Sequence, residues 1–190
     1  MLTVAILMKR MIKLDEIISS EQNSRVKSLK KLYSRKKRRQ KGKFILEGFR
    51  IINEALNTDA DFDHLFMSPE FYKSVDGQYL KEYFSRKNNI NDLLIVEERL
   101  LSKIADTNSH QGVTAVVNEP RYEMEEIFSK EDGNEKLLLL DRIQDPGNMG
   151  TIIRTAVAAG IDGVIILKGS VDIYNLKVLR ATMGAVFNIP

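Results

Sequence analysis

The sequence contains no cysteine and only two histidines. Without cysteine, the chain cannot form a disulfide framework, a thiolate zinc site or a cysteine nucleophile, and this composition fits a reducing, intracellular setting. His64 and His110 lie far apart in the sequence, and neither has a second histidine four residues away, so a histidine-based metal cluster is not expected. The sequence therefore predicts a protein without a metal site.

Long hydrophobic runs are missing as well. The apolar opening MLTVAILMKRM has its positive charges after the apolar residues, whereas a signal peptide has them before. This stretch is also far too short to span a bilayer, which takes roughly 20 apolar residues. These features predict a cytoplasmic protein that does not associate with membranes.

Acidic residues are missing from one part of the chain. Between Gln22 and Leu46 there are eleven Lys or Arg and no Asp or Glu, while the rest of the chain has 18 basic and 26 acidic residues, a net charge of −8. A basic block on an otherwise acidic protein favours a polyanion as partner, and the counterions released on binding make the affinity depend on salt. The alternative is a solvated, partly disordered basic arm.

The apolar residues within this basic block fall at helical spacing, at Val26, Leu29, Leu32 and Tyr33. One face of such a helix can pack on a core while the basic side chains point outward. The block then runs into KFILEG, an apolar run with strand character that ties it to folded structure. The predicted polyanion-binding side chains are Lys27, Lys30, Lys31, Arg35, Lys36, Arg38, Arg39 and Lys43.

Periodicity and composition divide the chain into four segments: an N-terminal extension (1–20), an α/β domain (21–118), a linker (119–136) and a second α/β region (137–190). The 21–118 segment alternates helical and strand patterns and has the size of a small domain. The linker is rich in acidic residues, with a turn of helix expected around Met124 to Phe128. We therefore expect a two-domain α/β protein.

The second region has the order strand, helix, strand, helix, strand. Its first strand, LLLLD, is a continuous apolar run typical of a buried parallel strand. A glycine-rich loop then leads to a helix from about Thr151 to Ala159, and GVIILK and AVFNI supply the second and third strands. This order predicts parallel strands with right-handed crossovers. Because such a domain usually has on the order of 150 residues, the region looks cut short at Pro190.

The segment DRIQDPGNMGTIIRTA, residues 141–156, is the most informative part of the chain. Its loop lies between a strand and a helix N-terminus, where open α/β sheets bind ligands and where N–H groups and the helix dipole favour anions. The loop matches neither GxGxxG nor GxxxxGK[ST], so dinucleotide or triphosphate binding has weak support. Asn148 is a candidate functional side chain or, alternatively, the cap of the helix. Gly150 allows a backbone or a ligand to approach closely.

Arg154 lies one turn into the expected helix. From there it can reach back over the loop and hold a phosphate with two hydrogen bonds, and the alternative is a surface salt bridge. Helical spacing places Arg154 on a polar or small face with Thr151, Thr155 and Ala158, opposite an apolar face of Ile152, Ile153, Ala156 and Val157.

These residues resemble motif 1 of the SpoU/TrmH ribose methyltransferases, the knotted SPOUT class that transfers a methyl group from S-adenosylmethionine to an RNA 2′-hydroxyl. The similarity continues through VDIYNLKVLRATMGAVFNIP. The first domain resembles the ribosomal-protein-like RNA-binding domain that precedes many members, in the pieces NSRVKSLKKL, KFILEG and SHQGVTAVV. The resemblance extends from about Asn23 to Pro190, nearly the whole chain.

The resemblance implies a small α/β RNA-binding domain followed by the first βαβαβ part of an α/β-knot methyltransferase domain. It implies an S-adenosylmethionine-dependent RNA 2′-O-ribose methyltransferase, with ribosomal RNA as the expected substrate and a homodimer as the complete enzyme. Asn148 and Arg154 are the implied catalytic residues. Because a guanidinium stays protonated, Arg154 is expected to hold a phosphate and stabilise the developing alkoxide rather than act as a base. Lys177 and Arg180 share a helix face that would contact RNA or a partner subunit.

The sequence departs from the family pattern in two ways. The later motifs that build the cofactor pocket and the knot are expected beyond Pro190, so we interpret the chain as a fragment that is inactive alone. Thr182 stands where serine is usual. The start is open between Met1, Met8 and Met11, because the resemblance begins later. Two other interpretations remain: a non-catalytic RNA-binding protein or remnant of such an enzyme, and an ordinary nucleotide-binding α/β enzyme.

Overall fold

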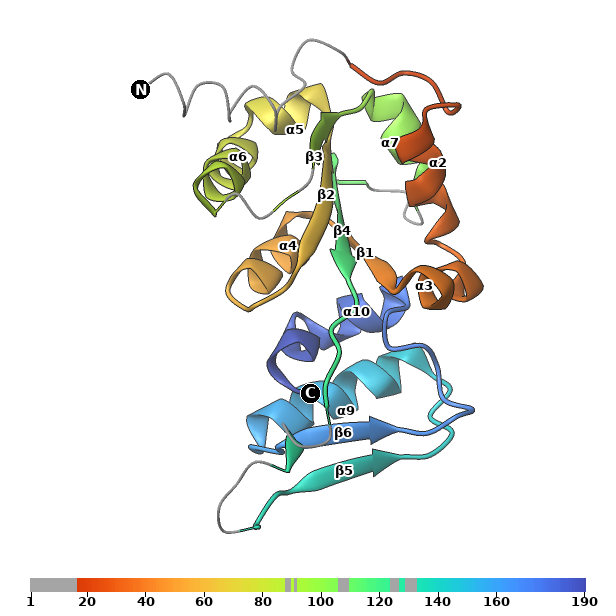
Figure 1. The fold of residues 1–190 in the computed structure, drawn as a ribbon, viewed down its shortest axis with the longest axis vertical. Helices are drawn as coiled ribbons and strands as arrows, with labels where there is room; N and C mark the ends of the chain where they lie inside the picture. Colours follow the sequence, from red (N-terminus) through yellow and green to blue (C-terminus); the bar gives the residue numbers. More distant parts are fainter. Residues whose placement is uncertain (1–16, 88–89, 91, 106–109, 124–126, 129–132) are drawn as a thin grey trace. The chain divides into compact units, whose positions relative to one another are not determined.

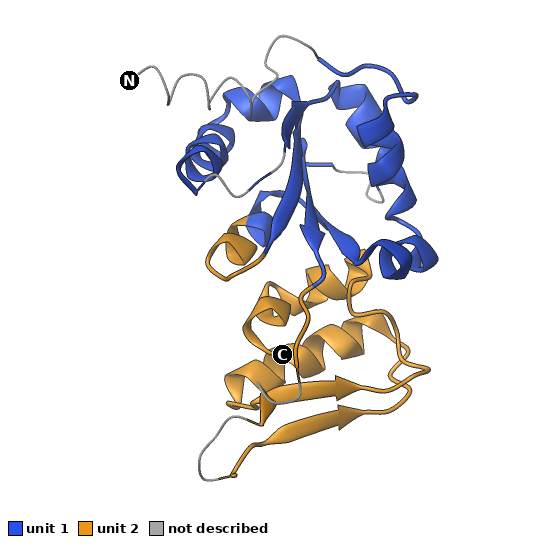
Figure 2. Cartoon of the chain, viewed as in Figure 1, with its two compact units in different colours: residues 1–52, 61–119 blue, residues 53–60, 120–190 orange. Residues whose placement is uncertain are grey.

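The computed structural model describes residues 17–87, 90, 92–105, 110–123, 127–128 and 133–190. They form two compact units, unit 1 from residues 1–52 and 61–119, and unit 2 from residues 53–60 and 120–190 (Figure 2). The opening MLTVAILMKRM and most of the helical turn expected around 124–128 lie outside the described residues. None of the helices in the described ranges is long and apolar enough to cross a membrane.

A mixed sheet forms the centre of unit 1 (Figure 1). β4 pairs antiparallel with both β1 and β2, whereas β2 and β3 are parallel. The strands β1, β2 and β3 therefore end at the same edge of the sheet, where β4 begins. β1 coincides with the KFILEG run that has strand character in the sequence, and the other three strands fit the alternating helical and strand patterns of the 21–118 segment. Across the sheet the order is β1 (Lys43–Glu47), β4 (Val113–Asn118), β2 (Phe62–Met67) and β3 (Asp92–Ile95).

Helices cover both faces of this sheet. Figure 1 shows α2 (Ser24–Lys31) and α7 (Glu98–Ile104) on one face, and α5 (Pro69–Lys73) and α6 (Val75–Lys87) on the other. Between the layers lie aromatic and aliphatic side chains with almost no exposure, which form the core. Another helix, α4 (Phe49–Leu56), follows β1.

The basic block is folded rather than an arm. It forms α2 and a second helix, α3 (Arg35–Lys41), so the alternative of a disordered basic arm is wrong. In α2, Val26 and Leu29 are each 1% exposed, whereas the basic side chains of the helix point outward, as the spacing predicts. Apolar spacing does not predict α3 as a separate helix, because a run of cations has no apolar periodicity.

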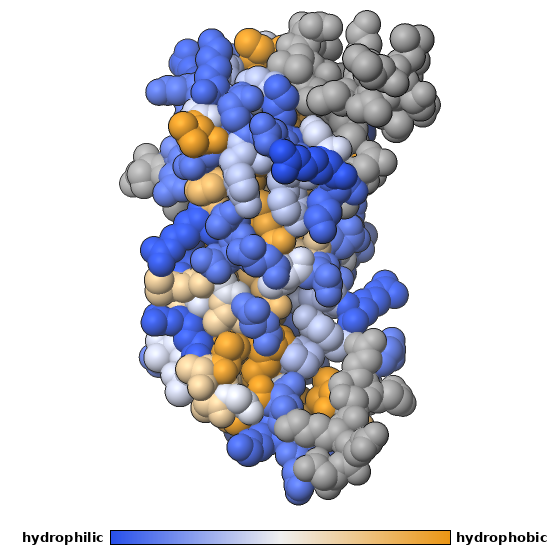
Figure 3. Space-filling model, turned by 90° about the vertical axis from the view of Figure 1, so that its left-hand side faces the viewer, coloured by the Kyte–Doolittle hydropathy of each residue, from blue (hydrophilic) through white to orange (hydrophobic). Residues whose placement is uncertain are grey.

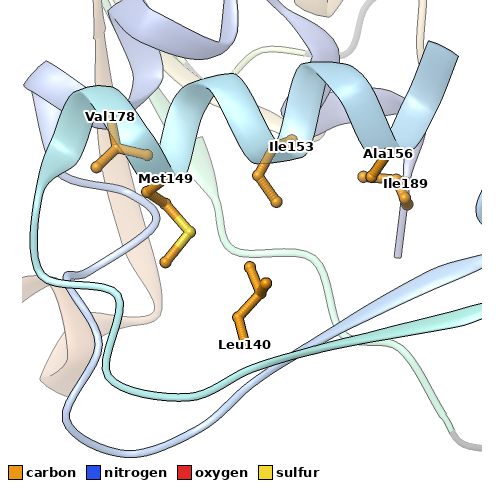
Figure 4. Close-up of a cluster of buried hydrophobic side chains, with 6 residues drawn as sticks. All are labelled: Leu140, Met149, Ile153, Ala156, Val178 and Ile189. Atoms are coloured by element: carbon orange, nitrogen blue, oxygen red, sulfur yellow. The ribbon is translucent and has the colours of Figure 1, made fainter. Parts of the chain in front are cut away.

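Unit 2 consists of a parallel strand pair covered by helices. β5 (Leu137–Leu140) pairs with β6 (Gly163–Ile166), and α9 (Pro146–Ala158) connects the two strands. The chain continues into α10 (Leu176–Thr182) and a short 3₁₀ helix, η1. Figure 4 shows the core that α9 forms with its neighbours, made of Leu140, Met149, Ile153, Ala156, Val178 and Ile189.

The second unit corrects the expectation of a buried first strand. Leu140 is buried, but Leu139 is 60% exposed and the two other leucines of β5 are half-buried. Side chains alternate across a strand, and in this part of the chain only the face toward α9 is covered. On the face drawn in Figure 3, apolar side chains are more frequent in unit 2 than in unit 1, where hydrophilic ones predominate.

The third strand expected at AVFNI is also wrong. Residues Ala185–Asn188 form the 3₁₀ helix η1, and the backbone becomes extended only at Ile189. Gly184, with φ 91°, turns the chain out of α10 before a strand can start. Pairing with β6 appears only at Pro190, whose carbonyl oxygen accepts a hydrogen bond of 2.9 Å from the Val164 N–H. The apolar residues of this stretch thus pack on α9 instead of joining a ladder.

Candidate functional site

The helices α2 and α3 carry the cations of the basic block on exposed positions. Within the described ranges, the exposed side chains of Lys27, Lys31, Lys36 and Arg39 form no ion pair or hydrogen bond. Lys30 differs because its Nζ lies 3.6 Å from Glu21 Oε2. A set of exposed cations without acidic partners keeps its charge available for an incoming anion.

Arg38 and Lys43, two members of the predicted polyanion-binding set, have structural contacts instead. Arg38 is 6% exposed, and its guanidinium donates hydrogen bonds of 3.0 Å to the carbonyl oxygens of Leu32 and Tyr33. These bonds fix the turn between α2 and α3. Lys43 Nζ lies 2.6 Å from the buried Asp63 carboxylate. The expectation that Arg38 and Lys43 point toward a polyanion is therefore corrected, because sequence spacing cannot show which cation of a dense block turns inward.

His110 holds the loop that precedes β4. Its Nδ1 accepts a hydrogen bond of 3.0 Å from the Gly112 N–H, and its Nε2 lies 3.0 Å from Thr114 Oγ1. Burial lowers the pKa of His110, although the carboxylates of Glu47 and Glu98 act in the opposite direction. The imidazole thus serves as a neutral clamp at the edge where β1 and β2 end. The sequence alone does not predict this role, because its signal is a single histidine two residues before a glycine.

The start of α9 lies earlier than the sequence predicts. Asp145 caps the helix, with its Oδ1 accepting a hydrogen bond of 2.7 Å from the backbone N–H of Asn148, and Pro146 is the first helical residue. The expected glycine-rich loop is therefore the first turn of the helix, and Asn148 is not the cap. The cap also places a negative charge where an anion was expected, so this helix end is a poor phosphate site. The sequence does contain a signal for this helix start, because Asp145 and Pro146 precede apolar residues at helical spacing.

Asn148 and Arg154 are both exposed on α9. In the described part of the chain, neither side chain forms a hydrogen bond or ion pair, so the alternative of a helix cap for Asn148 is wrong, and the described residues supply no salt-bridge partner for Arg154. Six residues correspond to about 9 Å along a helix and about 120° around it. The two side chains are thus more than one helical turn apart and do not share one face. The predicted exposed face with Arg154 and the predicted buried face with Ile153 are confirmed.

Gly150 is required by helix packing. A Cβ atom at this position would lie 2.3 Å from the Cβ of Ala181 and 2.7 Å from its carbonyl carbon. The close approach that the sequence predicts at Gly150 is therefore to the backbone of α10. On the outer side of α10, Lys177 and Arg180 are both exposed, as their spacing predicts.

The loops after β5 and β6 are joined to each other at the carboxyl ends of the strands. The Ile143 carbonyl oxygen accepts a hydrogen bond of 2.8 Å from the Val171 N–H, and the buried Ser170 hydroxyl accepts one of 3.2 Å from the Ile143 N–H. Arg142 adopts a left-handed conformation with φ 55°, and its guanidinium pairs with the Asp141 carboxylate at 3.0 Å. The two loops at this edge are therefore held together by hydrogen bonds.

Comparison with known proteins accounts for most of the chain. Residues 23–115 match the MRM3-like substrate binding domain, and residues 135–190 match the SpoU rRNA Methylase family. The chain belongs to the SpoU/TrmH family. This SpoU chain is 32% identical over 173 residues to the 23S rRNA (guanosine(2553)-2′-O)-methyltransferase RlmP of Bacillus subtilis, covering 91% of its own length and 63% of that protein.

Other relatives of the SpoU chain are also rRNA methyltransferases by name. It is 35% identical over 160 residues to the mitochondrial rRNA methyltransferase 3 of Homo sapiens, covering 83% of its own length and 36% of that protein. Among solved structures, the AdoMet-bound rRNA methyltransferase from Sinorhizobium meliloti matches with a TM-score of 0.76 and 31% identity, over 92% of this chain and 63% of that one. The SpoU chain thus spans less than two thirds of the length of these relatives.

Proposed function

We propose that this SpoU chain forms the RNA-binding part and a portion of the catalytic part of an S-adenosylmethionine-dependent rRNA 2′-O-ribose methyltransferase. The support is the presence, in one chain, of an MRM3-like substrate-binding match followed by a SpoU methylase match. The names of relatives point the same way, since they include rRNA 2′-O-methyltransferases and an AdoMet-bound structure. The segments 21–118 and 137–190 are the proposed domains.

Unit 1 binds the RNA in this proposal. The exposed cations of α2 and α3 are suited to phosphate groups, which dominate protein–nucleic acid affinity. They lie on two helices fixed by the inward-facing Arg38. Recognition of folded RNA would then depend on the shape of the backbone together with its charge. The proposed phosphate contacts are Lys27, Lys30, Lys31, Arg35, Lys36 and Arg39.

Arg154 and Asn148 are the proposed catalytic side chains of unit 2. An exposed guanidinium without an acidic partner can hold the phosphate beside the target ribose and stabilise negative charge on the attacking 2′-oxygen. It stays protonated in proteins, so it does not accept the proton of the hydroxyl. Asn148 supplies a neutral amide that can orient the nucleotide by donating and accepting hydrogen bonds.

The described residues of unit 2 do not by themselves fit an adenosylmethionine pocket. The space between α9 and the strands is filled by Met149 and Ile153, both 0% exposed, and Gly150 lies against α10 without room for a Cβ. The loops at the carboxyl ends of β5 and β6 are bonded to each other. The methyl donor is thus proposed for the complete enzyme, and its contacts are not assigned to residues 133–190.

Methyl transfer is tested on the protein as its own cells produce it, with tritiated S-adenosylmethionine and ribosomal RNA. We expect Arg154→Lys to lower turnover strongly with little change in cofactor affinity, because lysine keeps the charge but loses the planar, two-bond geometry. Lys136→Arg, at an exposed cation of the same unit with no proposed role, is the control. Equal turnover in wild type and Arg154→Lys would remove Arg154 from the site.

A non-catalytic RNA-binding protein is the second candidate. It is favoured by one observation, that the cationic surface of α2 and α3 is complete within the described residues whereas an adenosine pocket is not. RNA affinity without methyl transfer by the cell-derived protein would establish it.

We also propose that the complete enzyme is a cytoplasmic homodimer, and light scattering on that protein tests its mass.

A further inference from the structure

Unit 1 contains a cavity of about 290 Å³ between α2 and the sheet. Four of its lining side chains are apolar and buried: Leu29 from α2, Leu32 directly after α2, Phe66 from β2 and Val116 from β4. Small-molecule sites have mostly apolar walls with a few polar groups, and their volumes begin at about 300 Å³. The cavity is therefore of a size for one flat ring system rather than for a larger cofactor.

His64 supplies an unusual polar group to this cavity. Its Nδ1 lies 2.7 Å from Asp63 Oδ2 and donates a hydrogen bond to this carboxylate. Its Nε2 is buried, lies 3.6 Å from Asp92 Oδ2 and has no hydrogen-bond partner within the described part of the chain. In the neutral ring, Nε2 is then an acceptor that lacks a donor. Buried polar atoms are nearly always paired, so this atom calls for a donor that the described residues do not supply.

The cations that line the cavity differ in what they already bind. Arg25 pairs with Asp92 at 2.6 Å, and Lys43 pairs with Asp63 at 2.6 Å. Lys41 is exposed, and its Nζ donates a hydrogen bond of 2.9 Å to the Ser28 hydroxyl. It has no carboxylate partner among the described residues, so its charge is available to a phosphate.

We propose that this cavity binds one unpaired nucleotide of the RNA, and the proposal rests on the RNA-binding role of unit 1. The apolar faces of the base lie between α2 and the sheet, an amino group of the base donates to His64 Nε2, and the phosphate lies on Lys41. Sequence-specific RNA recognition commonly uses such unstacked bases. Cytosine, adenine and guanine have an exocyclic amino group and uracil has none, so uridine is the disfavoured nucleotide.

The first test uses the unmodified 190-residue chain labelled with ¹⁵N. Cytidine 5′-monophosphate is expected to shift the Nε2 resonance of His64, while the only other histidine, His110, serves as the reference in the same spectrum. Uridine 5′-monophosphate is expected to shift it less at equal concentration. No shift with the cytidine nucleotide, or an equal shift with inorganic phosphate alone, overturns the proposal.

The second test fills the cavity from α2. Ser28→Leu places an apolar side chain at the cavity wall, whereas Ser28→Ala removes the same hydroxyl without filling the space. For a single-stranded cytidine-containing RNA we expect about tenfold weaker binding by Ser28→Leu, the size of one lost hydrogen-bonded contact, and little change for Ser28→Ala. Equal affinities of the two variants overturn the proposal.

A third variant separates this proposal from the RNA-binding role itself. Lys31, Lys36 and Arg39 changed together to Ser leave the cavity lining intact but remove exposed charge. If this variant binds RNA weakly while Ser28→Leu binds normally, the cavity proposal fails and the RNA-binding role stands. If it binds RNA as the wild type does, the RNA-binding role of α2 and α3 fails.

Discussion

Replacing Gly150 by alanine tests the packing of α9 on α10. The new Cβ would lie 2.3 Å from the Ala181 Cβ and 2.7 Å from the Ala181 carbonyl carbon. Carbon atoms in contact are about 3.5–4.0 Å apart, so both distances are far too short. Because one of the two atoms belongs to the backbone, no change of side-chain rotamer can relieve the contact, and α10 must move.

The expected loss follows from two opposing contributions. Alanine in place of glycine inside a helix contributes about 1 kcal/mol in favour of α9. Overpacking in a filled core costs about 1–3 kcal/mol, and a clash with backbone belongs at the upper end. We therefore expect Gly150→Ala to destabilise unit 2 by about 1–2 kcal/mol. Gly147→Ala, in the same helix, is the matched control, because its Cβ would meet only the Asp145 carboxylate at 3.1 Å.

Amide hydrogen exchange of α9, followed by mass spectrometry, measures this local stability. A loss of about 1–2 kcal/mol makes exchange roughly five- to thirtyfold faster in Gly150→Ala, whereas Gly147→Ala should exchange at the wild-type rate or more slowly. Adding Ala181→Gly to Gly150→Ala should restore part of the protection, because it removes the 2.3 Å contact and leaves the 2.7 Å one. Equally slow exchange in Gly150→Ala and Gly147→Ala would refute the packing argument.

Three further predictions concern stability. The pKa of His110 in the folded chain lies below its ordinary 6.5, so the unfolded chain binds more protons as the pH falls through 6.5. Unit 1 should therefore lose stability toward pH 5. Urea unfolding of His110→Asn should show a weaker pH dependence than that of the wild type. Arg38→Met should destabilise unit 1 by about 1–3 kcal/mol in urea unfolding, because it leaves two carbonyl oxygens without this donor. Arg39→Met changes an exposed side chain and should leave the urea midpoint unchanged. Leu139→Lys should cost less than about 0.5 kcal/mol by thermal unfolding, because the side chain is 60% exposed, and a large loss would show that this strand face is covered.

Much of the first unit is predictable because its apolar residues recur at the regular spacing of helices and strands. The strands of the sheet and the buried face of α2 follow from apolar spacing alone. The second helix of the basic block is not predictable in this way. Its anchor is Arg38, and a cation that bonds two carbonyl oxygens has the same sequence signal as its exposed neighbours.

The second unit shows where periodicity misleads. Glycines at 147 and 150 suggest a loop, but the Asp145 cap starts the helix before them and α10 packs against the second glycine. The apolar residues of AVFNI suggest a strand, yet strand formation needs a partner ladder, and here the first bond to β6 is made by Pro190. For the candidate site, helical spacing predicts that Asn148 and Arg154 are exposed. Only the three-dimensional structure shows that neither side chain has a partner in the described ranges.

The inward turn of Arg38 has a consequence for how the cations of α2 and α3 meet an anion. A disordered arm loses about 1–2 kcal/mol of backbone entropy for each residue that becomes ordered on binding. Helices that are already joined by the bonds from Arg38 to Leu32 and Tyr33 avoid most of that loss. Their charges also keep a fixed mutual spacing, so this surface can discriminate between polyanions by the distance between phosphates and not only by their number.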